Sequence, residues 1–422
     1  MLEIKKSKWI CIIISLVCLL VVFLLPNHSD DESRITEITL IHGWGSTESD
    51  HVAMRQIYED FEKENPDIKI NLLSLPTTDE VIRKVEDSIM VGEVPDIIFF
   101  AGKGRDSIYQ YMISHAYALN LMPYIEADAE FGSNLAPANI EYWTTADGRL
   151  YTISDVLIMS GGYWYNEDIF RNAGITTLPT TWDEFEAICL KIENWARESG
   201  NEVKALQLSA EGYLYFASSI LAQKGICVDN GQVVIEQEKM MDTLSLLEQI
   251  HAYSTGGSGD YNYRDETSLF NEGNLAIYVN GVWGAAMISD NINASYVLLP
   301  SGADGLCCES AGIGYVLGST GDSAREEASV RFLKYMMSPK VQERILIETQ
   351  QLPANPKLVI DDYFEQIPRF CQAVAVGKAA KQKTEIPDQM WSNQQHSMLE
   401  KNIIAVLSGK MNKQTLIEML TN

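Results

Sequence analysis

Residues 163–192, YWYNEDIFRNAGITTLPTTWDEFEAICLKI, specify their local structure more clearly than any other part of the chain. Asn166 can cap a short helix that carries acids in its first turn, and Gly174 can end it. After a proline-containing turn, Thr181 and Glu184 have the spacing of a capping box, and apolar residues then recur on one helical face. The order strand, short helix, turn and long helix predicts one unit of an α/β fold.

Strands and helices also alternate over the segment that begins at residue 35. The patterns predict strands at 35–41, 68–72 and 96–101, with an amphipathic helix after each of the first two. Such alternation predicts a mainly parallel sheet with helices on both faces. Ligands of such sheets bind beyond the carboxyl ends of the strands, so we expect the loops 44–50 and 101–105 to face a ligand.

The bulk composition limits the function. With 422 residues, 46% of them apolar, the chain can bury a large core, and we expect two lobes. The net charge of −26 and the isoelectric point near 4.6 exclude nucleic acid as a partner, because phosphates need a basic face.

The N-terminus has the layout of a signal sequence. Lys5, Lys6 and Lys8 precede an apolar run at 9–25, which is long enough to span a bilayer as a helix. The residues before Cys18 depart from the lipoprotein pattern, and no convincing cleavage site follows the run. We therefore expect residues 1–34 to form an uncleaved membrane anchor, in preference to a lipid anchor or a released form, with the rest of the chain outside the cytoplasm.

Metal and disulfide frameworks are not indicated. Five cysteines remain after the N-terminal run, without a CxxC pair, and the six histidines lack metal-ligand spacing. We expect free thiols, no metal and no cofactor.

Two motifs resemble one known family. Residues 165–185 read Y-N-x-D-x-F-x-x-A-G followed by P-T-T-W-D-E-F, and residues 270–283 read F-x-x-G-x-x-A-x-x-x-x-G-x-W. Both are similar to motifs of the extracellular solute-binding proteins of ABC importers, in the branch that binds sugars and oligosaccharides and includes the maltodextrin-binding proteins. The resemblance covers roughly residues 36–422, with the motifs in the expected order.

The resemblance implies a two-lobed α/β fold of the periplasmic-binding-protein type, with a mainly parallel sheet in each lobe and the ligand cleft between them. Lobe 1 would comprise residues 35–155 and 313–354, and lobe 2 residues 156–312 and 355–422. At the first crossing between lobes the family usually has a proline, whereas this chain has Ser154.

The expected binding residues combine aromatic rings, which cover the apolar faces of sugars, with polar groups that satisfy sugar hydroxyls. Glu211, Tyr213 and Trp391 are assigned by resemblance to sugar-contacting positions of the family, and Trp283 lies in the second motif. We expect no catalytic residue, and we expect the glycine-rich stretch 256–267 to be a surface loop. The predicted ligand-binding residues are Trp44, Ser46 and Arg105 from lobe 1, and Tyr163, Glu211, Tyr213, Trp283 and Trp391 from lobe 2.

The function that follows from the resemblance is binding of a carbohydrate, an oligosaccharide in the first instance, and its delivery to an ABC importer permease by hinge closure. We expect a monomer that meets the membrane only through its N-terminal segment. Two alternatives remain open: a tethered sensor that signals to a receptor or kinase, and a secreted glycoside hydrolase. The chain lacks the GxSxG, P-loop, GxGxxG and HExxH motifs of common enzyme classes.

Overall fold

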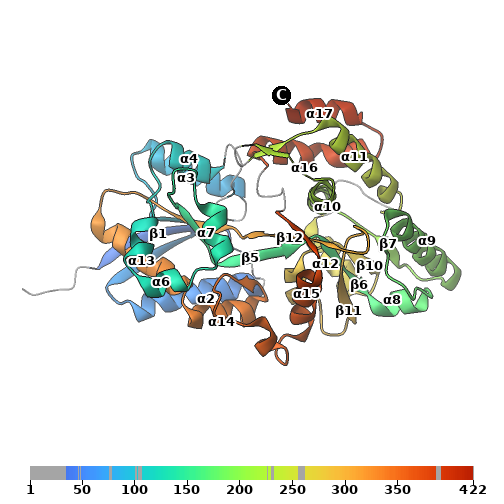
Figure 1. The fold of residues 1–422 in the computed structure, drawn as a ribbon, viewed down its shortest axis with the longest axis horizontal. Coiled ribbons are helices and arrows are strands. Elements are labelled where there is room, and N and C mark those ends of the chain that lie inside the picture. Colours follow the sequence, from blue (N-terminus) through green and yellow to red (C-terminus); the bar gives the residue numbers. More distant parts are fainter. Residues whose placement is uncertain are drawn as a thin grey trace, which may run out of the picture.

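Two α/β lobes lie side by side and are joined by a third sheet (Figure 1). This computed structural model describes residues 35–45, 47, 49–75, 78–99, 102, 107–225, 227–229, 232–254, 262–385 and 391–421. The predicted membrane anchor at residues 1–34 therefore lies outside the described residues. Within the described ranges, no helix has the length and apolar character needed to cross a membrane.

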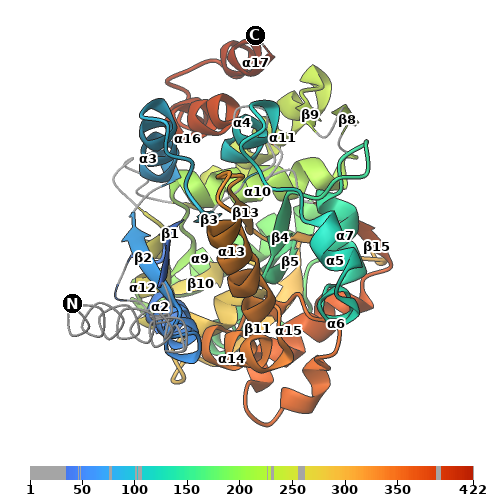
Figure 2. The same ribbon diagram turned by 90° about the vertical axis from the view of Figure 1, so that its left-hand side faces the viewer.

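Lobe 1 is built on the sheet β2-β1-β3-β13-β4. Its strands are β1 (Thr36–His42), β2 (Ile68–Ser74), β3 (Ile97–Phe99), β4 (Thr152–Ser154) and β13 (Gly314–Leu317). Its helices are α2 (Ser49–Glu64), α3 (Thr78–Met90), α4 (Ile108–Ser114), α5 (Met122–Glu126), α6 (Ala129–Ser133), α7 (Pro137–Trp143), α13 (Ser323–Met336) and α14 (Pro339–Thr349). Figure 2, seen from the lobe 1 side, shows α13 across the front of the sheet, with α3 and α4 at one end and α2 and α14 at the other.

Lobe 2 is built on the sheet β11-β6-β10-β7. Its strands are β6 (Gly162–Asn166), β7 (Lys204–Leu206), β10 (Leu275–Tyr278) and β11 (Ala294–Leu298), beside a hairpin of β8 (Cys227–Asp229) and β9 (Gln232–Val234). The helices of this half are α8 (Glu167–Asn172), α9 (Trp182–Ser199), α10 (Ala210–Gln223), α11 (Gln237–His251), α12 (Tyr263–Asn271), η1 (Val282–Ala286), η2 (Ile360–Tyr363), α15 (Pro368–Ala379), α16 (Asn393–Leu407) and α17 (Lys413–Thr421).

Both faces of the lobe 2 sheet are buried. Successive side chains of β6 point to opposite faces of the sheet and pack into different hydrophobic cores. Tyr163 packs with Phe185 and other residues of α9 and α10 on one face. Trp164 packs with residues of α12, η1 and α15 on the other face. The sheet therefore forms the middle layer of a three-layer lobe.

The connecting sheet, β14-β5-β12-β15, was not predicted from the sequence. Its strands are β5 (Val156–Ser160), β12 (Leu306–Ala311), β14 (Leu352–Pro353) and β15 (Gln382–Thr384). The chain passes between lobe 1 and this sheet at three crossings, which lie at 154–156, 311–314 and 353–355.

The two-lobed α/β architecture is confirmed, but the pairing within the lobes is mixed rather than mainly parallel. In lobe 1, β1 pairs in parallel with β2 and β3, whereas β13 runs antiparallel to β3 and β4. In lobe 2 only the β10–β7 pair is parallel. The physical reason is that β13 and β6 enter their lobes from the connecting sheet and not from a helical crossover.

The predicted caps are confirmed. The Asn166 side chain accepts hydrogen bonds from the first turn of α8, and Gly174 adopts a left-handed conformation with φ +71° just after that helix. Thr181 and Glu184 form the capping box of α9. The side chains of Cys189, Cys307, Cys308 and Cys371 are buried and free, as expected.

At the first crossing, where the family usually has a proline, this chain has Ser154, whose hydroxyl group is buried. It accepts a hydrogen bond from Trp143 Nε1 at 2.8 Å and donates one to the carbonyl oxygen of Gly312 at 2.5 Å. The side chain of Gln342 similarly joins the first crossing to the third. Its Nε2 donates to Asp155 O at 2.9 Å, and its Oε1 accepts from Ala354 N at 2.8 Å. The three crossings are thus joined by buried hydrogen bonds on the lobe 1 side.

Candidate ligand-binding cleft

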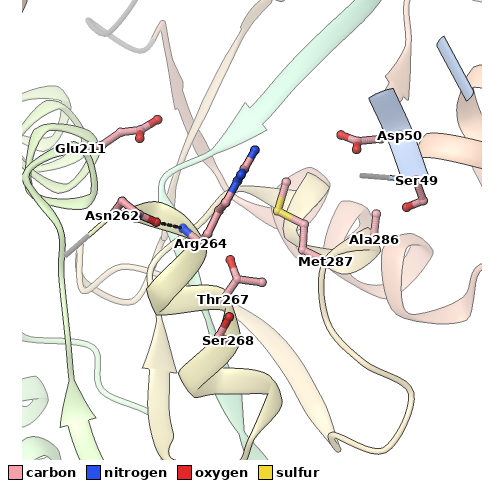
Figure 3. A pocket seen from close by; sticks show the side chains of 9 residues that line it. All are labelled: Ser49, Asp50, Glu211, Asn262, Arg264, Thr267, Ser268, Ala286 and Met287. Atoms are coloured by element: carbon pink, nitrogen blue, oxygen red, sulfur yellow. Dashed lines mark hydrogen bonds between the residues drawn. The ribbon is translucent and has the colours of Figure 1, made fainter. Parts of the chain in front are cut away.

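A cavity of about 740 Å³ lies between the lobes. One wall comes from the start of α2 in lobe 1, and the opposite wall comes from α10, α12 and η1 in lobe 2 (Figure 3). The residues that line it are Ser49, Asp50, Glu211, Asn262, Arg264, Thr267, Ser268, Ala286 and Met287. Its volume lies within the range of typical small-molecule sites.

Three helices begin at this cavity. Ser49 and Asp50 open α2, and Glu211 lies in the first turn of α10, which Ser209 caps by accepting a hydrogen bond from Gly212 N at 3.0 Å. Asn262 caps α12, accepting from Arg264 N at 2.9 Å, a contact drawn in Figure 3. Because helix N-termini carry a partial positive charge, this arrangement favours ligand groups that accept hydrogen bonds.

A buried hydrogen-bond network supports the lobe 2 wall. The hydroxyl of Tyr278 contacts Thr267 Oγ1 at 2.9 Å and accepts from Asn280 Nδ2 at 2.8 Å. Asn280 Oδ1 in turn accepts from Gly281 N at 2.9 Å. Thr267, which lines the cavity, is therefore connected to the turn that carries Trp283.

Trp283 lies over Gly281. A Cβ atom added at Gly281 would come within 2.1 Å of the Trp283 ring, so any other residue there would displace the indole. The indole is half-buried and meets the ring of Tyr215 edge to face, with the ring centroids 6.2 Å apart. Trp283 and Tyr215 thus form an aromatic pair in the half of the molecule that carries Glu211, Ala286 and Met287.

Of the six predicted binding residues that the structure describes, only Glu211 is among the residues that line the cavity, and its side chain is exposed. Trp283 precedes the lining residue Ala286 in η1. Ser46 and Arg105 lie outside the described residues. The predicted loop 44–50 is represented in the cavity by its last two residues, Ser49 and Asp50.

Trp44 packs into lobe 1. Its half-buried ring lies against Phe99 and His51, with centroid distances of 5.3 and 4.9 Å. Its backbone N–H donates to His42 Nδ1 at 3.1 Å. Burial, with the charge of Arg55, lowers the pKa of His42 to about 4, so this histidine is neutral at physiological pH.

Tyr163, Tyr213 and Trp391 lie in the core. In this conformation they do not face the cleft, so their assignment as ligand-binding residues is corrected. Tyr163 and Tyr213 have no exposed surface, and Trp391 is 3% exposed. The Tyr213 hydroxyl hydrogen-bonds to His251 Nδ1, and Trp391 Nε1 donates to Ser218 Oγ at 3.1 Å. Strand periodicity turns the Tyr163 ring inward, and helix periodicity turns the Tyr213 ring inward, whereas Trp391 is buried just before α16 begins. A match of residue types to family positions does not reveal these directions.

The α12 residues were missed. The stretch 256–267 was expected to be a surface loop, but from Tyr263 onward the chain is helical, and Asn262, Arg264, Thr267 and Ser268 line the cavity. The signal was present, because Asn262 and Asp265 have capping-box spacing and form that box. The neighbouring glycines obscured it.

The described residues offer no candidate metal site. Within them, no group of three or more His, Cys, Asp or Glu side chains is placed to hold a metal ion. The cavity offers hydroxyl, amide, carboxylate and guanidinium groups around an open space.

Two lobes, a connecting sheet and a polar cavity lined from both sides are the architecture of a binding protein. Residues 44–343 match the family described as bacterial extracellular solute-binding protein. Since this match covers more than half of the chain, the chain belongs to that family.

Solved structures share the whole fold. A solute-binding protein of Streptococcus pneumoniae in complex with the blood group A-trisaccharide has a TM-score of 0.75 at 22% identity, over 91% of this chain and 98% of that one. The maltose/maltodextrin-binding domain from Bdellovibrio bacteriovorus bound to maltotriose has a TM-score of 0.71 at 19% identity, over 92% and 98% of the two chains.

A curated relative shares part of the sequence. A putative binding protein of Brucella abortus is 22% identical over 262 residues, which is 59% of this chain and 60% of the relative's own length.

Proposed function

We propose that this protein binds a carbohydrate, an oligosaccharide in the first instance, in the cavity between its lobes and delivers it to an ABC importer permease. The observation that carries the proposal is the cavity itself, which is about 740 Å³ in volume and is lined from both lobes by polar side chains. The two structures described above are of proteins in complex with sugars, which supports the same class of ligand.

The lining groups suit the chemistry of sugars. Sugar hydroxyls both donate and accept hydrogen bonds, so they need partners of both kinds. Asp50 and Glu211 can accept, Arg264 can donate, and the hydroxyls of Thr267 and Ser268 can do either. Trp283 and Tyr215 supply aromatic surface for the apolar faces of sugar rings.

Closure of the lobes would follow from the distribution of these groups. A ligand favours the closed state only through contacts that it gains on closing, so it must touch both lobes. Asp50 lies on α2 of lobe 1 and Glu211 on α10 of lobe 2, at opposite sides of the cavity in Figure 3. The moving bodies would be residues 35–155 with 313–354 and residues 156–312 with 355–422, and residues 1–34 would tether the protein outside the cytoplasm.

The test is a sugar screen on the purified full chain in detergent. We expect maltotriose, raffinose, chitotriose or the blood group A-trisaccharide to raise the melting temperature and to bind saturably by calorimetry, without any product of hydrolysis. If none of these binds while an amino acid or peptide does, the carbohydrate proposal fails. Release of shorter sugars would instead indicate the hydrolase alternative.

The importer step needs its own measurement. Reconstituted permease should take up the bound sugar only when the binding protein is present, and a variant that cannot bind the sugar should abolish uptake. If the sugar-loaded protein engages a histidine kinase and not a permease, the sensor alternative is correct.

A further inference from the structure

Glu266 is a buried acid behind the lobe 2 wall of the cavity. Its side chain is fully buried on α12, and its Oε1 accepts a hydrogen bond from Ser209 N at the start of α10. Its Oε2 has no hydrogen-bond partner among the residues that the structure describes. A Cβ atom added at Gly212 would lie 2.8 Å from Oε1 and 3.2 Å from Oε2, so the carboxyl group is in close contact with the backbone of the first turn of α10.

This contact joins the two helices that supply the polar lobe 2 wall. The same first turn of α10 carries Glu211, and α12 carries Arg264 and Thr267, which line the cavity with it. We propose that Glu266 is a positioning residue of the cleft: its buried carboxyl group keeps the first turn of α10 against α12 and thereby sets the spacing between Glu211 and the α12 side chains. The inference rests on the proposed function, since it assigns these side chains to sugar binding.

The charge of Glu266 is balanced between opposing effects. The N-terminus of α10 favours the ionised carboxylate. Burial, together with the negative charges of Glu211 on α10 and Asp265 on α12, favours the protonated acid. Burial is the largest effect and raises the pKa of Glu266 from 4.5 to about 7. The other titratable neighbour, Tyr213 on α10, stays neutral because burial raises its pKa as well.

Sugar binding should therefore be coupled to this proton. A sugar in the cavity displaces water from around Glu211, so the repulsion between Glu211 and Glu266 is screened less and Glu266 retains its proton more tightly than in the free protein. A pKa that is higher in the bound state adds affinity below the free-state value near 7, and that gain is lost as the pH rises through the bound-state value. Affinity should rise as the pH falls from 8.5 to 6.

The first test needs no sugar. Hydrogen exchange of the full chain is measured for the wild type, Glu266→Ala, Glu266→Gln and the matched control Glu272→Ala, which alters an exposed acid at the far end of α12. Loss of the acceptor for Ser209 N in Glu266→Ala should speed exchange in the peptide over 207–214 about tenfold. Glu266→Gln keeps an acceptor, so it and the control should stay within about threefold of the wild type. Unchanged exchange in Glu266→Ala would overturn the positioning role.

The second test uses calorimetry with maltotriose, raffinose, chitotriose and the blood group A-trisaccharide at pH 6.0 and 8.5. For a sugar that the wild type binds, its dissociation constant should be about threefold lower at pH 6.0, as expected for a pKa rise of half a unit on binding. In Glu266→Gln this pH dependence should vanish, while Glu266→Ala should bind about tenfold more weakly than Glu266→Gln at both pH values.

The outcomes separate the two proposals. An equal pH dependence in the wild type and Glu266→Gln, or wild-type affinity in Glu266→Ala, would refute the role of Glu266 and leave sugar binding intact. If the wild type binds none of the four sugars, the proposed function fails, and the exchange result still decides whether Glu266 positions α10.

Discussion

Asp155, at the first crossing, should make the stability of the protein depend on pH. The variant Asp155→Asn should be less stable than the wild type at low pH and more stable than the wild type at high pH. The side chain is 1% exposed, and its Oδ2 accepts a hydrogen bond from the Tyr315 hydroxyl at 2.7 Å. Its Oδ1 has no hydrogen-bond partner within the described part of the chain. Burial raises the pKa of this carboxyl group from 3.8 to about 7.

The size of the effect follows from that rise. At 1.36 kcal/mol per pKa unit, a shift from 3.8 to about 7 amounts to about 4 kcal/mol. The folded protein binds this proton more tightly than the unfolded chain does. The contribution to the free energy of unfolding is therefore fully present below pH 3.8 and is lost as the pH rises through 7.

Asparagine in this position removes the titration. Its amide nitrogen would take the place of an oxygen that has no partner, which costs about 1–3 kcal/mol at any pH. The variant should therefore be less stable than the wild type at pH 4 by about that amount, and more stable by about 1–3 kcal/mol at pH 8.5, where the wild type carries the buried charge.

The assay is urea unfolding at pH values from 4 to 8.5, with Asp290→Asn as a control for loss of an exposed acid. The two stability curves of wild type and Asp155→Asn should cross between about pH 4.5 and about pH 6, whereas the control curve should run parallel to the wild type. If the Asp155→Asn curve also runs parallel, folding does not raise the pKa of the buried carboxyl group.

Three further outcomes are expected. Trp283→Ala should weaken sugar binding about tenfold or more without unfolding lobe 2, as measured by calorimetry and melting temperature, and unchanged affinity would remove Trp283 from the site. Gly281→Val should displace the Trp283 indole and weaken binding to a similar extent, with a change in tryptophan fluorescence as the structural readout. Arg325→Ala should destabilise the protein by about 3–5 kcal/mol in urea unfolding. The reason is that Arg325 forms two hydrogen bonds to the buried carboxylate of Asp96, which would remain without a countercharge in the variant. A loss of stability below about 1 kcal/mol would contradict this prediction.

Local signals predicted the elements well. The caps at Asn166 and Thr181 mark the helix starts that the structure has, because each depends on residues within one turn. The connecting sheet could not be predicted in the same way. β5 pairs with β12 and β14, whose residues lie more than a hundred positions away, and such pairing leaves no local pattern.

The binding site was harder to predict than the fold for a related reason. The type of residue at a family position does not fix the direction of its side chain. Tyr213 and Tyr215 lie two residues apart on α10, and helix geometry turns the first ring into the core and leaves the second half-buried beside Trp283. The α12 residues were not predicted as binding residues, because the glycine-rich residues before them suggested a surface loop where the structure has a well-capped helix.

The hydrogen bonds at the crossings also constrain how the lobes can move. Gln342, on α14 of lobe 1, bonds to the backbone of both Asp155 and Ala354, and Ser154 bonds to Gly312, so the lobe 1 end of each crossing is fixed by buried contacts. Breaking several buried hydrogen bonds at once would cost more than a sugar can supply through a few polar contacts. If the lobes close on a ligand as proposed, bending should therefore occur on the other side of the crossings, in the short strands β5, β12 and β14, where the sheet can twist while its own pairing stays intact.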